Sequence, residues 1–158
     1  MNASTAAPRA DHPKLTAALA TLASADLGSP CGQPPPPLLE KAIREFNEGE
    51  FFEQHETIET LWRAEPGAVR HLYEGILLVG VGLYHTLEKH NFYGACVKLD
   101  HGIRLLSVCP VTCHGLDVAR LVEDARRARR HLVRLGPDGI ARFRRDRVPR
   151  IHRVQAVA

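Results

Sequence analysis

The chain has 158 residues, a length that suits one domain able to bury its core without disulfides or a structural metal. Its four cysteines are scattered, which excludes the dense framework of a small secreted scaffold and favours a reducing, cytoplasmic setting. The net charge of +3 hides a concentration of eleven arginines against two acids between Arg126 and Arg153, so the basic charge is gathered in the last fifth of the chain.

The N-terminal segment, residues 1–37, is rich in Ala, Ser, Thr and Pro and ends in four prolines that cannot continue a helix. We expect a disordered tail and spacer here. Within it, residues 15–25 favour a short amphipathic helix docked on the body over a secretion signal. The folded domain is expected to span residues 38–136, followed by an Arg-rich C-terminal tail over residues 137–158.

Hydrophobic periodicity predicts an all-α fold, a compact bundle of about five helices with the third helix at its centre. The third helix contains ten consecutive uncharged residues, too few to cross a bilayer. Gly75 and Gly82 share one face of it, which predicts that a neighbouring backbone approaches closely. Asn91 is a plausible N-cap for the fourth helix, and no convincing strand is predicted. The expected helices cover residues 38–46, 50–64, 68–90, 92–106 and 116–135.

The second predicted helix carries the candidate site. At 100° per residue, His55 falls near the middle of the apolar stripe, with Glu59 one turn further on and Trp62 close by. Thr57 projects from the opposite, solvated side. Because an unpartnered buried carboxylate costs several kcal/mol, the His55 and Glu59 pair must be satisfied by each other, by other polar groups or by a metal.

A divalent metal ion is one interpretation of this pair, because side chains at i and i+4 stack on one helical face. The ligands would be His55 and Glu59, with His85 or Glu74 of the third helix completing the set. The competing interpretation is a buried hydrogen-bonded pair that fixes helix packing. The residues expected around the pocket are Phe52, Glu56, Trp62, Glu74 and Asn91.

The sequence gives little support to a zinc knuckle, a hydrolytic nucleophile or a nucleotide-binding loop. Residues 109–114 carry two cysteines and a histidine, but their spacing differs from that of a zinc knuckle, so loop and core thiols are favoured. The chain has no G-x-S-x-G elbow and no glycine-rich phosphate loop. This argues against nucleophilic hydrolysis and against nucleotide binding of the P-loop or Rossmann type.

Several segments together resemble the uncharacterised helical family called domain of unknown function 309. The family pattern H-x-x-x-E-x-x-(W/Y) is matched by His55, Glu59 and Trp62, and the likeness covers roughly residues 38–121. The resemblance implies a small all-helical domain of bacteria and archaea whose motif has been proposed to bind metal. Further matching residues are Phe46, Asn47, Gly49, Phe51 to Glu53, Glu56, Arg63, Gly75 and Ile76, Leu83 to His85, Asn91, and Gly94 with Ala95.

Two functions from different classes remain open, and the sequence does not decide whether the protein is an enzyme. The leading hypothesis is a cytoplasmic metal-binding or small-ligand protein, a metal-dependent hydrolase in its most specific form. The rival is a non-enzymatic interaction or structural module whose basic tail binds an acidic partner. Neither nucleic acid nor a membrane is expected as a partner, because no nucleic-acid module or membrane span accompanies the basic block. The apolar third helix is compatible with a homodimer.

Overall fold

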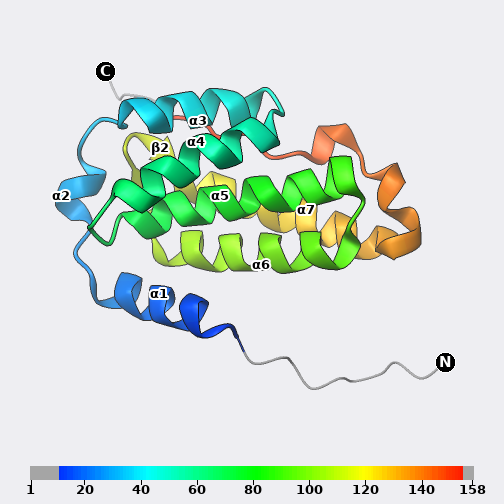
Figure 1. Ribbon diagram of the computed structural model, residues 1–158, viewed down its shortest axis with the longest axis horizontal. Coiled ribbons are helices and arrows are strands. Elements are labelled where there is room, and N and C mark those ends of the chain that lie inside the picture. Colours follow the sequence, from blue (N-terminus) through cyan, green and yellow to red (C-terminus); the bar gives the residue numbers. More distant parts are fainter. Residues whose placement is uncertain (1–10, 155–158) are drawn as a thin grey trace.

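Seven α-helices account for most of residues 11–154, the part of the chain that the computed structural model describes (Figure 1). Local sequence sets several helix starts: Pro37 occupies the first turn of α3, whereas Asn91 and Asp117 cap α6 and α7 with their side chains. The helices are α1 Pro13–Ser24, α2 Gly28–Cys31, α3 Pro37–Asn47, α4 Phe51–Ala64, α5 Arg70–Tyr84, α6 Phe92–Val108 and α7 Val118–Gly139.

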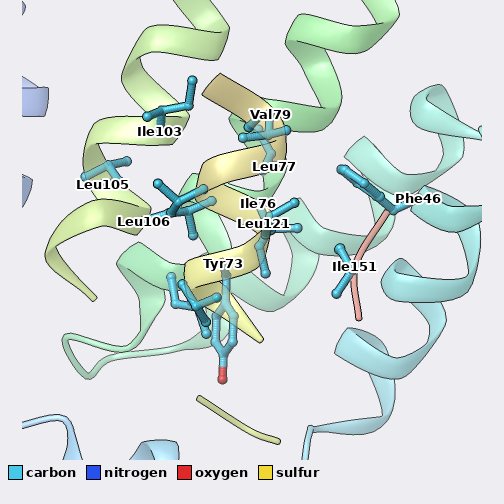
Figure 2. Packing of buried hydrophobic residues seen from close by; sticks show 14 of the residues in the cluster. Phe46, Tyr73, Ile76, Leu77, Val79, Ile103, Leu105, Leu106, Leu121 and Ile151 are labelled. Atoms are coloured by element: carbon cyan, nitrogen blue, oxygen red, sulfur yellow. The ribbon is translucent and has the colours of Figure 1, made fainter. Parts of the chain in front are cut away.

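Helix α5 lies between α4 and α6, as Figure 1 shows, so the prediction of a central third helix is confirmed. Its apolar side chains fill the core together with residues of α6 and α7 (Figure 2). The helix is shorter than predicted. It changes at His85 into a π-helical turn, His85–Lys89, which ends at His90 in the left-handed conformation (φ 49°).

Glycines bring the backbones of α5 and α6 together, as the spacing of Gly75 and Gly82 predicted. A Cβ atom at Gly75 would lie 2.8 Å from the Leu106 side chain, and one at Gly82 would lie 2.7 Å from Leu99 Cγ. Gly102 of α6 faces the same crossing, where a Cβ would lie 2.9 Å from the carbonyl oxygen of Gly75. The close contact therefore depends on the missing side chains.

The N-terminal segment is folded over residues 11–37, so the prediction of a disordered tail is wrong there. Leu15, Ala18 and Leu22 of α1 are buried, which confirms the predicted docked helix. The apolar side of α1 covers part of α6. Residues 1–10 lie outside the described part of the chain.

A short hairpin in the loop before α7 departs from the prediction of an all-helical chain. Strands β1 Thr112–Cys113 and β2 Leu116–Asp117 pair antiparallel across His114 and Gly115. Both turn residues have positive φ, 52° and 73°, as a two-residue hairpin of type I′ requires.

A disulfide between Cys31 and Cys113 joins α2 to this hairpin across 82 residues of sequence. The prediction of loop and core thiols for residues 109–114 is therefore wrong for Cys113, whereas Cys109, like Cys96, is free. The scattered cysteines were the reason to expect a reducing compartment. The disulfide removes that reason, because disulfides persist mainly in oxidising compartments. Burial raises the pKa of the Cys109 thiol to about 12, which keeps it protonated.

His114 adds polar contacts to the same junction. Its backbone N–H donates to the Cys31 carbonyl at 2.8 Å, and its Nδ1 lies 2.9 Å from the carbonyl oxygen of Gln33. The ring Nε2 lies 2.9 Å from the Tyr73 hydroxyl of α5. The pKa of Tyr73 is raised to about 12, by burial first and then by Glu65, so its hydroxyl stays protonated and can donate.

The C-terminal segment also packs on the body, so the predicted Arg-rich tail is docked over residues 137–154. After a kink at Gly136 (φ 67°), two 3₁₀ turns follow, Ile140–Arg142 and Arg145–Arg147. Ile151 is buried beside Phe46 of α3 (Figure 2). Its backbone exchanges two hydrogen bonds with the Asn47 side chain, at 2.7 and 3.0 Å.

Residues 155–158 lie outside the described part of the chain. Across residues 11–154, none of the helices combines the length and the apolar character that a membrane span requires.

Candidate functional site

Helix α4 buries a face that is shifted from the predicted one. Its buried residues are Phe51, Gln54, Thr57, Ile58 and Leu61, so the prediction of a solvated Thr57 is wrong. The physical reason is that α4 packs against both α3 and α5, and together these neighbours cover a wider arc than one apolar stripe.

His55 and Glu59 lie together at the edge of that buried face. His55 Nε2 is 3.2 Å from Glu59 Oε2, which confirms that the two side chains meet. Their side chains are 41% and 28% exposed, so the prediction that the pair is enclosed in the core is wrong. Arg63 pairs with the other oxygen of Glu59, which is therefore satisfied by two basic groups. Partly exposed pairs of this kind contribute little to stability.

Trp62 lies one turn beyond Glu59 and is partly buried. The guanidinium carbon of Arg70, the first residue of α5, lies 5.1 Å from the centre of the indole ring, which is a cation–π distance. Neither the indole Nε1 nor Arg70 Nε makes a hydrogen bond to any residue between 11 and 154. Trp62 therefore anchors the end of α4 against the start of α5.

The residues expected to complete a metal site have other partners or positions. Glu74 pairs with His71 on its own helix, at 2.9 Å. His85 lies in the π-helical turn, and the pKa of its ring is lowered, by burial first and then by Lys98 and Lys89. Among residues 11–154, no three His, Cys, Asp or Glu side chains are grouped so that they could hold a metal ion. The three-ligand set of His55, Glu59 and His85 is therefore not assembled here.

The remaining expected pocket residues are dispersed. Phe52 is 52% exposed, with its ring centre 6.0 Å from that of Tyr84. Glu56 points to solvent on the exposed side of α4. Asn91 is the N-cap that the sequence predicted, because its Oδ1 accepts from Gly94 N at 3.0 Å. These residues do not line a common pocket with His55.

Gln54 is a buried polar residue that the sequence reasoning missed. It is fully buried, and its side-chain amide makes no hydrogen bond to the described residues. The amide packs directly against Gly80 of α5, where a side chain would collide with it. Its position three residues after Phe51 and four before Ile58 places it on the buried face, which is the signal that could have identified it.

A basic cavity of about 250 Å³ lies on the exposed side of α7, and we call its lining residues the α7 basic cluster. Arg127 is paired with Asp124 at 2.7 Å, and Arg130 lies 3.8 Å from Glu123. The other two arginines of the cluster form no ion pair with any residue from 11 to 154. The cluster consists of Arg127, Arg130, His131, Arg134 and Arg147.

His131 connects this cluster to the C-terminal segment. Its Nε2 accepts a hydrogen bond from the backbone N–H of Arg144 at 3.1 Å, and its ring lies 4.8 Å from that of Phe143. The pKa of His131 is lowered, by burial first and then by Arg147 and Arg144. The ring is therefore neutral near pH 7, and the arginines supply the positive charge.

Comparison with known proteins gave one match, to a family model. The family model described as Domain of unknown function (DUF309) matches residues 39–97. No curated protein and no solved structure matches the chain. The matched residues run from α3 into α6 and include the His55, Glu59 and Trp62 motif, whereas the α7 basic cluster lies beyond them.

Proposed function

We propose, from the match of residues 39–97 to the DUF309 family model and from the basic surface beyond it, that the protein is a non-enzymatic interaction module that binds an acidic protein segment. In this proposal the family domain supplies the scaffold and the α7 basic cluster supplies the binding surface. The observation that carries it is a cavity lined by four arginines and a histidine, with no acidic residue in its lining.

The charges of the cluster favour an anionic partner. Arg134 and Arg147 are exposed and have no carboxylate partner within the described residues, so their guanidinium groups are free to donate bidentate hydrogen bonds to a carboxylate. Like charges gathered in one cavity repel each other, and an anion relieves this repulsion. Carboxylate groups of an acidic segment therefore complement the surface.

The proposal is tested by the anisotropy of a fluorescein-labelled decaglutamate peptide titrated with the full chain. We expect saturable binding that weakens as salt rises from low ionic strength, because exposed charges are screened beyond about 8 Å at physiological salt. The double variant Arg134→Gln, Arg147→Gln should weaken binding about tenfold, if each lost charge contributes about 0.7 kcal/mol.

A matched control removes the same charge elsewhere. Arg126→Gln with Arg129→Gln also lowers the net charge by two and should leave decaglutamate binding nearly unchanged. Equal weakening by both double variants would mean that only overall charge matters and would overturn the assignment to the cluster. Preferred binding of an oligothymidylate of the same length would replace the acidic protein segment by nucleic acid as partner.

A metal-binding function at the motif is the second candidate, favoured by the contact between His55 Nε2 and Glu59 Oε2 at 3.2 Å. These two side chains could supply two ligands to a divalent ion, with water or another molecule supplying the rest. We expect zinc, titrated by calorimetry, to bind the native chain and not the His55→Ala variant. Equal heats from both proteins would eliminate this candidate.

A further inference from the structure

A groove of about 660 Å³ lies between α1, α6 and α7, away from the motif helix. Its volume falls within the range of about 300–1,000 Å³ that is usual for small-molecule sites. Helix α1 forms one wall, α6 the floor and α7 the other wall. The groove therefore exists only because the N-terminal segment is docked on the body.

One side of the groove is apolar. Leu19 of α1 is partly buried, Ile103 of α6 is 6% exposed, and Val108 at the end of α6 is 39% exposed. All three line the groove. Burial of such side chains by a ligand is favourable by about 25 cal/mol for each Å² of apolar surface removed from water.

The opposite side is basic, and two of its arginines are held in place without being neutralised. Arg126 donates from Nη2 to the Ser107 hydroxyl at 3.2 Å, and Arg129 donates from Nε to the Cys96 carbonyl at 3.2 Å. Neither arginine pairs with a carboxylate of residues 11–154. Their remaining N–H groups are available to a ligand, and the existing hydrogen bonds reduce the entropy lost on binding.

Asp100, the acidic residue that lines the groove, and Asp11 nearby both contact Arg104. Asp11 accepts two hydrogen bonds from Arg104, at 2.6 and 2.7 Å, and Asp100 lies 3.9 Å from the same guanidinium. The hydrogen bond from Arg104 lowers the pKa of Asp11, the largest of several effects on that carboxyl. Arg104 thus offsets one of these two negative charges, and the net positive charge of the groove lining comes from the arginines of α7.

We infer that this groove binds a small amphipathic organic anion, with its charged head on Arg126 and Arg129 and its apolar chain along Leu19 and Ile103. A carboxylate or a phosphate head satisfies the guanidinium groups, and a chain of medium length fits the apolar wall. The groove shares Arg130 with the α7 basic cluster, but Arg126 and Arg129 belong to the groove alone, so the inference does not depend on the proposed function.

Calorimetry with decanoate below its micelle concentration tests the inference on the full chain. We expect one decanoate to bind saturably. Acetate, which has the carboxylate but no apolar chain, should not bind, and neither should decyltrimethylammonium, which has the apolar chain but a positive head. The Arg126→Gln, Arg129→Gln variant should weaken decanoate binding about tenfold, because two charge-assisted contacts are lost. Val108→Ser, at an exposed position, should weaken it about threefold.

The Arg134→Gln, Arg147→Gln variant is the matched control, since it removes the same charge from the neighbouring cluster. Its decanoate affinity should equal that of the native chain. Circular dichroism confirms that each variant is folded. Equal binding of decyltrimethylammonium, unchanged binding in the Arg126 and Arg129 variant, or no saturable decanoate binding at all would each overturn the inference. Decyl phosphate in place of decanoate shows which head group binds more tightly within the same site.

Discussion

Gly102→Ala is expected to lower the free energy of unfolding by about 2–3 kcal/mol, the range of a serious overpacking at a core contact. The added Cβ would lie 2.9 Å from both the Gly75 carbonyl oxygen and the Val79 backbone nitrogen. Both are backbone atoms of α5, so neither can rotate away as a side chain would. Alanine gains about 1 kcal/mol in helix propensity, which offsets only part of this loss.

Urea denaturation followed by circular dichroism measures this change. The matched control is Gly67→Ala, whose Cβ would meet only the flexible Glu65 carboxyl, at 2.9 Å, and which should cost less than about 1 kcal/mol. If Gly102→Ala is as stable as the native chain, α5 and α6 do not cross as closely as described here.

Reduction of the Cys31–Cys113 disulfide is expected to lower the free energy of unfolding by about 2–4 kcal/mol. The bond joins residues that are 82 apart in the sequence, so it restricts the chain between them in the unfolded state. Thermal melting with and without dithiothreitol measures the effect. The double variant Cys31→Ala, Cys113→Ala should melt at the temperature of the reduced native chain. Cys96→Ser is the control: it keeps the Cys31–Cys113 bond, so it should melt at the temperature of the native chain both without and with dithiothreitol.

Alkylation of the unfolded chain gives an independent readout of the same bond. Without reductant, two of the four cysteines should be modified, and after reduction all four. Modification of all four without reductant would contradict the disulfide. Because Cys31 is the last residue of α2, which follows α1 in the chain, reduction of the bond should also increase hydrogen exchange in α1.

Most helices of the body could be predicted from sequence because their signals are local. Apolar periodicity, the prolines before α3, the Asn91 cap and the Gly136-Pro137 stop act within a few residues. The close approach at Gly75 and Gly82 was also predictable, since a stripe of glycines on an apolar helix has few other uses. Outside residues 38–136 the prediction was less complete. The docked helix within residues 15–25 was predicted, but the rest of residues 11–37 was predicted to be a disordered spacer because of its Ala, Ser, Thr and Pro content.

The candidate site could be predicted only in part. Sequence spacing correctly placed His55 beside Glu59, because i and i+4 side chains meet on any α-helix. Sequence spacing could not predict that this pair lies at the edge of the buried face, because the position of that edge depends on how α3 and α5 pack around α4. The basic cavity was visible in the sequence only as an arginine-rich block, because its lining comes from α7 and from a segment folded back beside it.

The sequence by itself determined most helices of the body, the Asn91 cap, the glycines on one face of the central helix and the proximity of the motif pair, because these follow from the order and spacing of residues in the chain. The tertiary structure decided which face of α4 is buried, that Cys31 meets Cys113, and that both ends of the described chain dock on the body. The physical reason is that periodicity fixes which residues share a face, whereas long-range packing fixes what covers that face.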